Sequence, residues 1–307
     1  MTGLGFGKVG VLAGGPSSER EISLRSGNAV YDALIKDGID AIFLDVKDDI
    51  YDIINNNKID IAFIALHGRF GEDGTVQKIL GAAGIPYTGS GAEASGFALD
   101  KIVSKEIFNR KGLPVPKGVV FEKSGYNPED CYRLGFPMVV KPHLEGSSIG
   151  LSIVRERGSL KEAVEKAFAF GGRILVEEYI DGRELTVGIL DDEPLPVIEI
   201  VTRQGVYDYT AKYSDPDTRY LVPAPLEDAV SSRARELGRS AHKALGCRSF
   251  SRVDMMLDKS GNIFLLEVNT IPGMTERSLL PKAAGAAGLS FSRLCVKLIE
   301  NAMKASR

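Results

Sequence analysis

Tryptophan is absent from the 307-residue chain, and cysteine and histidine are scarce, with three of each. The cysteines, Cys131, Cys247 and Cys295, are odd in number and far apart, so they form neither a disulfide framework nor a zinc-binding pattern. No apolar run approaches the roughly 18 residues of a membrane-spanning helix. Residues 1–15 hold one lysine and a short apolar stretch, too little for a secretory signal. These absences predict a soluble, cytoplasmic protein with structural cysteines.

An excess of one charge is also missing. The 38 Lys and Arg residues nearly balance the 41 Asp and Glu residues, which leaves a net charge of −3. No global basic field is therefore available to recruit nucleic acid or anionic lipid, and we expect neither as a partner. At about 100–200 residues per domain, the length indicates two or three structural modules.

Glycine, in contrast, is abundant, with 34 residues where an average usage of about 7% would give about 21. Many glycines cluster at the ends of apolar runs, at residues 14–15, 68–74, 89–91 and 146–150. Glycine lets the backbone turn sharply and approach a ligand closely. Loops of this kind on a strand-and-helix scaffold are where α/β enzymes carry their sites.

The first hundred residues alternate between strand and helix patterns. We expect strands over 8–13, 41–46, 59–66 and 85–88, and helices over 21–36 and 75–83. This alternation predicts a small doubly wound parallel sheet.

The pattern changes after one long helix expected over 92–110. Strands of hairpin-rich, largely antiparallel sheets are expected over 118–121, 138–141, 151–155, 174–179, 184–190 and 196–200. Helices are expected over 160–170 and 227–245, followed by a hairpin over 251–257 and 263–268 and a last helix over 291–303. The fold class is α/β (α+β), with a domain boundary near Asp100.

Two glycine motifs match functional patterns but lie in the wrong context. Residues 5–10 fit the dinucleotide fingerprint G-x-G-x-x-G, which should follow a strand and open a helix, yet they precede the first strand. Residues 146–150 fit the hydrolase nucleophile elbow G-x-S-x-G, which needs a strand-to-helix turn, yet a strand is expected next. We therefore expect neither function.

The strongest local signal is the hairpin near the C-terminal end. If its turn centres on Ser260 and Gly261, Asp254 lies directly opposite Glu267, with Cβ atoms about 4.5–5.5 Å apart. Asn269 shares a strand face with Glu267. Two carboxylates this close stay ionised together only beside a cation, and oxygen ligands suit Mg²⁺. We interpret the three residues as metal ligands; a surface cluster or cross-strand hydrogen bonding is the alternative.

Two further segments have the character of a nucleotide site. Lys141 ends a buried strand, and the Gly/Ser loop after it can fold over phosphates while the ammonium supplies charge. Residues 176–180, followed by Glu184, resemble a strand edge that binds an adenosine. Backbone groups there could bind the base, and a carboxylate could bind the ribose hydroxyls. A solvated lysine and a polar strand end are the ordinary alternatives.

Together these motifs resemble the D-alanine–D-alanine ligase family of the ATP-grasp superfamily. Matching segments are residues 14–21, 67–69, 71–75, 100–101, 141–142, 145–148, 207–209, 212–213, 252–254, 266–275 and 278–279. Glu178 departs from the family pattern, in which many relatives have Lys; the backbone largely reads the base there, so we treat the departure as minor. The resemblance implies an N-terminal substrate-side domain over 1–100 and an ATP-grasp domain over 101–307. The central lobe spans about 101–180 and the C-terminal lobe about 181–307, with ATP between these lobes.

The activity implied is the conversion of ATP and two D-alanine molecules to D-alanyl-D-alanine, ADP and phosphate. The reaction passes through a D-alanyl phosphate and supplies peptidoglycan precursors for the cell wall. The implied cofactors are ATP and two Mg²⁺ ions, with Mn²⁺ able to replace them. The implied assembly is a homodimer formed through the N-terminal domain.

The same resemblance implies a role for each site residue. Nucleotide-binding residues are Lys101, Lys141, Ser148, Glu177, Glu178, Tyr179, Ile180, Glu184 and Lys212, and the metal ligands are Asp254, Glu267 and Asn269. Glu19 pairs with the first substrate's ammonium, Arg252 and the Gly273 N–H stabilise the oxyanion, and Ser278 with Leu279 holds the second substrate. Tyr213 joins Ser147 and Glu19 in a hydrogen-bonded set that shapes the second subsite. Residues 145–150 and 207–220 are expected to close over the ligands.

His67 follows an apolar strand, where a lone histidine is more often packed or hydrogen-bonded than catalytic; the resemblance places it near the first D-alanine carboxylate. A D-alanine–D-lactate ligase, another ATP-grasp carboxylate–amine ligase and a nucleotide-binding regulatory protein without turnover are the alternatives. The set of Glu19, Arg252, Asp254 and Glu267 argues against the last of these.

Overall fold

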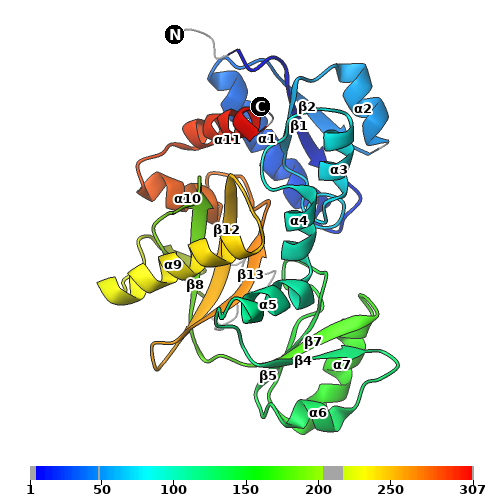
Figure 1. Ribbon diagram of the computed structural model, residues 1–307, viewed down its shortest axis with the longest axis vertical. Coiled ribbons are helices and arrows are strands. Elements are labelled where there is room, and N and C mark those ends of the chain that lie inside the picture. The colour runs from blue at the N-terminus through cyan, green and yellow to red at the C-terminus, as the bar shows by residue number, and fades with distance from the viewer. Residues whose placement is uncertain (1–4, 48, 203–216, 306–307) are drawn as a thin grey trace.

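The structure is a computed structural model that describes residues 5–47, 49–202 and 217–305. It contains three sheets, each covered by helices. In Figure 1 the first sheet lies at the top, the sheet formed last along the chain in the middle, and the remaining one at the bottom. The expected residues Tyr213 and Lys212, and most of the expected loop 207–220, lie outside the described residues.

The first hundred residues form a parallel three-stranded sheet in the order β2-β1-β3. Its elements are β1 (Val9–Gly14), α1 (Arg20–Lys36), β2 (Ala41–Val46), α2 (Ile50–Asn57), β3 (Ile61–Ile64), α3 (Thr75–Ala82) and α4 (Ala92–Leu99). Because side chains alternate along a strand, Val9 and Val11 of β1 pack in one cluster with α1, whereas Leu12 packs with α2 and α3 in another. Helices thus cover both faces, which confirms the predicted doubly wound sheet.

The second sheet is antiparallel and has the order β4-β7-β5-β6. Its region comprises α5 (Lys101–Arg110), β4 (Gly118–Glu122), α6 (Pro128–Tyr132), β5 (Met138–Pro142), β6 (Ser152–Val154), η1 (Arg157–Ser159), α7 (Leu160–Phe168) and β7 (Arg173–Glu178). Met138 and Val140 of β5 are buried with α7. The alternate residues of the strand, Val139 and Lys141, therefore point to the opposite face, where they line a cavity.

The third sheet has the order β11-β10-β8-β12-β13, with β9 paired to β8. Its region comprises β8 (Gly182–Leu190), β9 (Glu193–Pro194), β10 (Ile198–Val201), β11 (Arg219–Leu221), α9 (Asp228–Ala244), β12 (Phe250–Asp258), β13 (Ile263–Asn269), α10 (Leu279–Ala286) and α11 (Phe291–Ala305). Val187 and Ile189 of β8 share a cluster with α9, whereas Leu190 packs with α10. Both faces of the central strand are therefore buried.

The prediction of a single helix over 92–110 is wrong. Helix α4 ends at Leu99 and α5 begins at Lys101, because Asp100 between them has extended backbone angles of φ −78° and ψ 101°. The Asp100 carboxylate accepts hydrogen bonds from the N–H groups of Ile102 and Val103 at 2.9 and 3.3 Å. This is N-cap geometry, and the preference of Asp for that position outweighs the continuous helical pattern.

Two shorter segments also differ from expectation. Residues 279–286 form helix α10 within a stretch expected to be a loop. Residues 85–88, expected to be a strand, make a single bridge from Tyr87 to Ala62. Residues 279–286 are fewer than the roughly 11 that a helical periodicity needs, and residues 85–88 pair too briefly to form a strand.

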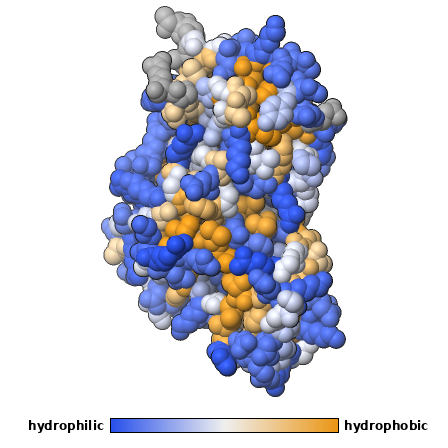
Figure 2. All heavy atoms as spheres, turned by 45° about the vertical axis from the view of Figure 1, so that its right-hand side comes forward, coloured by the Kyte–Doolittle hydropathy of each residue, from blue (hydrophilic) through white to orange (hydrophobic). Residues whose placement is uncertain are grey.

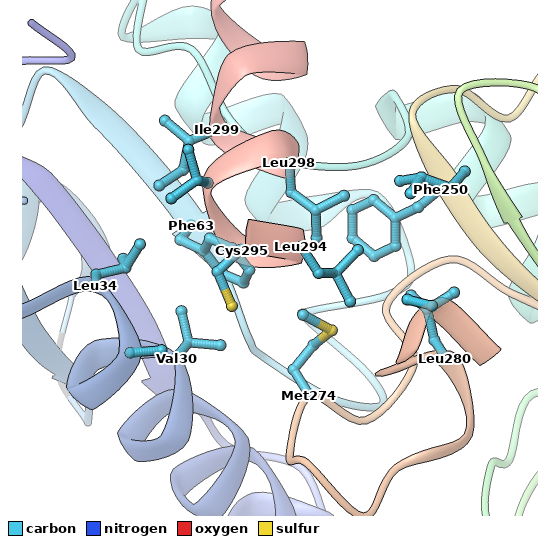
Figure 3. Packing of buried hydrophobic residues seen from close by; sticks show 14 of the residues in the cluster. Val30, Leu34, Phe63, Phe250, Met274, Leu280, Leu294, Cys295, Leu298 and Ile299 are labelled. Carbon is cyan, nitrogen blue, oxygen red and sulfur yellow. The ribbon is translucent and has the colours of Figure 1, made fainter. Parts of the chain in front are cut away.

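The last helix, α11, returns to the first sheet. Its buried residues share one apolar cluster with α1, β3, β12 and α10, as Figure 3 shows for Val30, Leu34, Phe63, Phe250, Met274, Leu280, Leu294, Cys295, Leu298 and Ile299. This cluster fixes the first sheet against the third. All three cysteines are buried and free, and burial raises the pKa of Cys247 to about 12.

The outer surface mixes polar and apolar side chains. On the face drawn in Figure 2, hydrophilic residues predominate and apolar residues gather near the middle. Within the part of the chain that the structure describes, no helix has the length and apolar character needed to cross a membrane.

His242 gives a prediction about stability in acid. Its side chain is fully buried in α9, with Nδ1 2.7 Å from Ser251 Oγ and Nε2 3.4 Å from Asp192 Oδ1. Burial lowers the pKa of His242 to about 4, against the opposing pull of Asp192. The unfolded chain therefore binds this proton first, so stability present above pH 6.5 is lost as the pH falls toward 4, on the order of 3 kcal/mol.

Urea unfolding between pH 7 and pH 4.5 measures this loss. His242→Asn keeps a polar atom near the Nδ1 position but cannot titrate, so its unfolding free energy should fall less steeply over that range. Equal slopes for the two proteins would contradict the assignment.

Candidate functional site

Two cavities adjoin each other, and Lys101 and Glu267 line both of them. The first cavity lies between the second sheet and the third, with walls from β5 and β7 on one side and β8, β12 and β13 on the other. The second lies between α1 of the N-terminal region and the segment that joins β13 to α10.

The first cavity gathers the predicted nucleotide-binding residues. Those that the structure describes all line it: Lys101, Lys141, Ser148, Glu177, Glu178, Tyr179, Ile180 and Glu184. Lys212 lies outside the described residues. Apolar side chains of Val139, Ile153, Met256 and Leu266 complete the walls. A cavity lined by both apolar walls and charged groups is suited to a flat base attached to an anionic group.

The hairpin of β12 and β13 pairs Asp254 directly with Glu267, as predicted. The turn differs from the expected one, because Leu257 pairs with Ile263, which places the turn centre on Ser260 alone. A β-bulge after Asp254 then shifts the register by one residue and restores the expected pair. The bulge also explains why two consecutive residues, Leu266 and Glu267, both line the first cavity.

The Asp254 carboxylate is held by two neighbours. Arg252 donates to it twice, from Nε at 2.9 Å and from a terminal nitrogen at 2.7 Å. Thr186 of the adjacent strand β8 donates from Oγ1 at 2.6 Å. Two-point contact with a guanidinium fixes the orientation of both side chains. No sequence pattern indicated Thr186, which becomes a neighbour only through the pairing of β8 with β12.

Lys101 connects the two cavities. Its Nζ lies 3.1 Å from Glu267 Oε2 and donates to the carbonyl oxygen of Glu145 at 2.8 Å. The Glu145 side chain in turn accepts a hydrogen bond from Arg69 at 3.1 Å. A buried ammonium therefore ties α5 both to the carboxylate of β13 and to the loop between β5 and β6.

The donor set of Asp254, Glu267 and Asn269 suits a hard cation such as Mg²⁺, because all three offer oxygen. Asn269 Oδ1 already accepts the Ile271 N–H at 2.9 Å, which orients the amide. Among the described residues, no group of three or more His, Cys, Asp and Glu side chains could hold a metal alone. Two protein carboxylates therefore need further oxygen ligands, which phosphate groups can supply.

Glu177 lies between two lysines in the wall of the first cavity. It is 2% exposed, and its oxygens lie 2.6 Å from Lys105 Nζ and 2.5 Å from Lys141 Nζ. Burial alone would raise its pKa, but the two ammonium groups outweigh this effect and lower the pKa of Glu177. Burial, partly offset by Glu177, lowers the pKa of Lys105 to about 8.

Lys105 was missed in the sequence. The available signal was its position four residues after Lys101, which places both lysines on one face of α5. Glu178, the departure from the family pattern, uses its side chain to accept the Lys117 N–H at 2.8 Å.

The loop between β5 and β6 has an unusual backbone. Ser147 and Ser148 have positive φ angles of 48° and 60°, a region that non-glycine residues rarely adopt. The loop joins two antiparallel strands, which confirms that its G-x-S-x-G motif is not a nucleophile elbow. The G-x-G-x-x-G motif, residues 5–10, runs into the first two residues of β1. It therefore does not follow a strand, as expected.

The second cavity gathers the predicted substrate-side residues that the structure describes. They are Glu19, His67, Ser147, Arg252, Gly273, Ser278 and Leu279, and the predicted metal ligand Asn269 lines the same cavity. Tyr213 lies outside the described residues. The cavity thus contains both carboxylates and cations, which suits zwitterionic ligands.

Glu19 and Ser147 meet in this cavity through a short hydrogen bond from Ser147 Oγ to Glu19 Oε1. Two glycines make room for the carboxylate: a Cβ on Gly68 or Gly146 would lie only 2.8 or 2.9 Å from Glu19 Oε2. The pair joins the N-terminal region to the loop between β5 and β6, since Glu19 directly precedes α1.

His67 is 5% exposed and hydrogen-bonded on both sides. Its Nε2 lies 2.9 Å from Ser26 Oγ and its Nδ1 lies 3.4 Å from Glu72 Oε1. Burial, with a smaller contribution from the nearby Glu19, raises the pKa of Glu72 despite the bond to His67. Ser26 and Glu72, to which the sequence analysis assigned no role, therefore fix the ring at the cavity wall.

At the other end of the cavity, Ser278 precedes α10. Its Oγ accepts the Thr275 N–H at 3.1 Å and lies 2.9 Å from Thr275 Oγ1. The Gly273 backbone is close, because a Cβ there would be 3.0 Å from Ser278 Oγ. This turn presents backbone and hydroxyl donors, which suit a carboxylate or an oxyanion.

The chain is similar to proteins of known activity over nearly its full length. Residues 107–300 match the family described as D-ala D-ala ligase C-terminus, and residues 47–90 match D-ala D-ala ligase N-terminus. The D-alanine–D-alanine ligase of Citrifermentans bemidjiense is 47% identical over 96% of both chains. That of Stutzerimonas stutzeri is 46% identical over 98% of this chain and 96% of its own.

Two solved structures are similar in fold and sequence. The D-alanine–D-alanine ligase from Bacillus anthracis complexed with ATP has a TM-score of 0.87 at 35% identity, with 98% of both chains covered. The VanG D-Ala:D-Ser ligase from Enterococcus faecalis has a TM-score of 0.81 at 33% identity, covering 96% of this chain and 99% of its own.

Glu177→Gln tests the buried charge cluster. The change leaves two buried ammonium groups without their counter-ion, so the free energy of unfolding at pH 7 should fall by about 3 kcal/mol. The loss should shrink at pH 9, because Lys105 then gives up its proton more readily. Urea unfolding at both pH values measures this.

Glu129→Gln is the matched control. Its ion pair with Arg157, at 3.0 Å, is exposed on both sides, so its loss should leave the free energy of unfolding nearly unchanged. Equal destabilisation by the two variants would refute the role given to Glu177.

Proposed function

Because the chain belongs to the D-alanine–D-alanine ligase family, we propose that its first cavity holds ATP and its second holds two D-alanine molecules. The activity is the ATP-dependent ligation of D-alanine to D-alanyl-D-alanine, which supplies peptidoglycan precursors. The observation that carries the assignment of the cavities is that they adjoin at Lys101 and Glu267. A phosphoryl group can therefore pass between the ligands without leaving the protein.

Two chemical steps need this arrangement. A carboxylate is a poor electrophile, so the first D-alanine carboxylate takes the terminal phosphoryl group of ATP and ADP leaves. The amine of the second D-alanine then attacks the acyl carbon, and inorganic phosphate leaves. Lys101, at the junction, and Lys141, in the wall of the first cavity, offset phosphate charge during the first step.

The second step develops negative charge on the acyl oxygen. Arg252 and the Gly273 N–H both border the second cavity and can donate to this oxyanion. Glu19, fixed by Ser147, would receive an ammonium group, and Ser278 with Leu279 would hold the second substrate. His67 also lines this cavity, and the family resemblance places it near the first substrate's carboxylate.

Asp254, Glu267 and Asn269 would hold Mg²⁺ beside the phosphates. When bound, the metal neutralises phosphate charge and orients the transferred group. Arg252 contacts Asp254 and Lys101 contacts Glu267, so both carboxylates are held in place in the protein alone. The fit to a divalent cation therefore rests on oxygen donors that are already oriented.

Other properties follow from family membership as proposals. We place the reaction in the cytoplasm and expect a homodimer formed through the N-terminal domain, without nucleic-acid or membrane partners. The division of the chain into an N-terminal domain, residues 1–100, and an ATP-grasp domain, residues 101–307, is also a proposal. Helix α11 of the second domain packs against α1 of the first.

Glu267→Gln tests the metal site. The variant keeps the shape of the side chain but loses its charge, so phosphate release that requires both D-alanine and Mg²⁺ should fall by at least about a hundredfold, a loss of about 2.7 kcal/mol. Its urea midpoint should fall less than that of Glu177→Gln, because the Glu267 side chain is 26% exposed and Lys101 keeps its hydrogen bond to the Glu145 carbonyl oxygen. Glu129→Gln, an exposed charge loss, is the control; undiminished turnover at ordinary Mg²⁺ would rule out Glu267 as a ligand.

The identity of the second substrate is a separate question, because one similar structure is a D-Ala:D-Ser ligase. Tyr213 is expected to join Glu19 and Ser147 at the second subsite. Tyr213→Phe should weaken D-alanine binding there by about 0.5–1.5 kcal/mol, the value of one hydrogen bond. Acceptance of D-lactate relative to D-alanine should rise.

Competition between D-alanine, D-serine and D-lactate from pH 6 to 9, with products separated by mass, decides the matter. The unmutated protein should form the D-alanine dipeptide at neutral pH. Preferential formation of the ester or of the D-serine product would overturn the assignment.

A further inference from the structure

The sequence showed no role for His143, yet the structure connects it to the break between α4 and α5. His143 Nδ1 lies 3.1 Å from Asp100 Oδ1. The His143 carbonyl oxygen also accepts the backbone N–H of Lys101 at 3.0 Å. Because Asp100 and Lys101 are consecutive, the two contacts fasten His143 to one point, the first residues of α5.

The chemistry of the contact fixes its direction. Asp100 Oδ1 already accepts from the N–H groups of Ile102 and Val103. A carboxylate that caps a helix in this way can only accept, so His143 must carry its proton on Nδ1 and donate. His143 and the two N–H donors outweigh burial and lower the pKa of Asp100, which therefore remains ionised.

A third contact extends the connection to the loop itself. Lys101 Nζ donates to the Glu145 carbonyl oxygen at 2.8 Å, two residues beyond His143. Residues 100–101 and 143–145 are thus joined by three hydrogen bonds over a very short stretch. The loop beyond Glu145 contains Ser147 and Ser148, whose strained backbone angles need support from the surrounding structure.

Neither Asp100 nor His143 is among the residues that line the two cavities. Both are only partly exposed, at 18% and 13% of their side chains. His143 Nδ1 and Asp100 Oδ1 face each other rather than a ligand. A role in the reaction must therefore act through Lys101 and the loop.

We propose that Asp100 and His143 are a positioning pair that sets Lys101 and the 145–148 loop at the spacing required to bind the ATP phosphates. The inference rests on the proposed function, because it takes the first cavity as the nucleotide site. The break in the helix gives Asp100 its place: a continuous helix would give its carboxylate no free N–H groups to cap.

Asp100 has a second role as the helix cap, so His143 is the better residue to change. His143→Ala removes the side-chain donor and leaves the backbone contact. His143→Asn places an amide N–H near the Nδ1 position and should restore the contact. The Gln side chain of His143→Gln is one methylene longer than Asn and carries its amide beyond the Nδ1 position. This variant should therefore behave like His143→Ala. Glu129→Gln, in the exposed pair with Arg157, is the control in the same lobe.

Two readouts separate positioning from stability. The first is binding of a non-hydrolysable ATP analogue with Mg²⁺, measured by calorimetry without D-alanine. The second is steady-state turnover, with KM for ATP and for D-alanine and kcat determined separately. Urea midpoints are recorded for every variant.

We expect His143→Ala and His143→Gln to weaken analogue binding and raise KM for ATP five- to twentyfold. KM for D-alanine should stay within twofold, and His143→Asn should stay within twofold of the original protein in all three constants. Unchanged analogue binding in His143→Ala and His143→Gln would overturn the inference. Weak analogue binding in His143→Asn would also overturn it. So would losses of binding that are proportional to the losses in urea midpoint. Loss of D-alanine turnover by the original protein with analogue binding intact would instead refute the proposed function.

Discussion

The ammonium group of Lys101 lies 3.1 Å from Glu267 and 2.8 Å from the Glu145 carbonyl oxygen, at the junction of the two cavities. It connects α5, the hairpin of the third sheet and the loop of the second. Its position depends on the break at Asp100, which starts α5 at Lys101. The site is therefore organised around one buried charge, and the glycine-rich loop takes its place relative to that charge.

The other buried charges of the site follow the same rule of close pairing. Glu177 is held by two lysines, and Asp254 is held by Arg252 and Thr186. Removing such groups from water is costly unless partners of opposite sign are within contact distance. These pairs hold the carboxylates in place before any ligand arrives. On binding, the ATP phosphates would contact the cationic side chains and Mg²⁺ would contact the carboxylates, in place of some of these pairs.

Much of the fold could be predicted because periodic apolar patterns are local. Strand β2 and most helices lie within a few residues of their expected places, and Asp254 faces Glu267 as expected. The break at Asp100 was missed because a capping side chain interrupts a helical pattern without changing it. Lys105, Thr186 and His143 were missed because their contacts join segments far apart in the sequence. Family resemblance supplied the roles of Glu19, Gly273 and Ser278, which no local pattern indicates.

The central claim is that the carboxylate of the first D-alanine receives the phosphoryl group at the junction of the two cavities. D-alanine labelled with ¹⁸O in its carboxyl group, incubated with ATP and Mg²⁺, tests this directly through mass analysis of the phosphate released. The account predicts one ¹⁸O atom in the phosphate for each dipeptide formed, because the bridging oxygen of the acyl phosphate leaves with phosphorus. Dipeptide formation with unlabelled phosphate would contradict it.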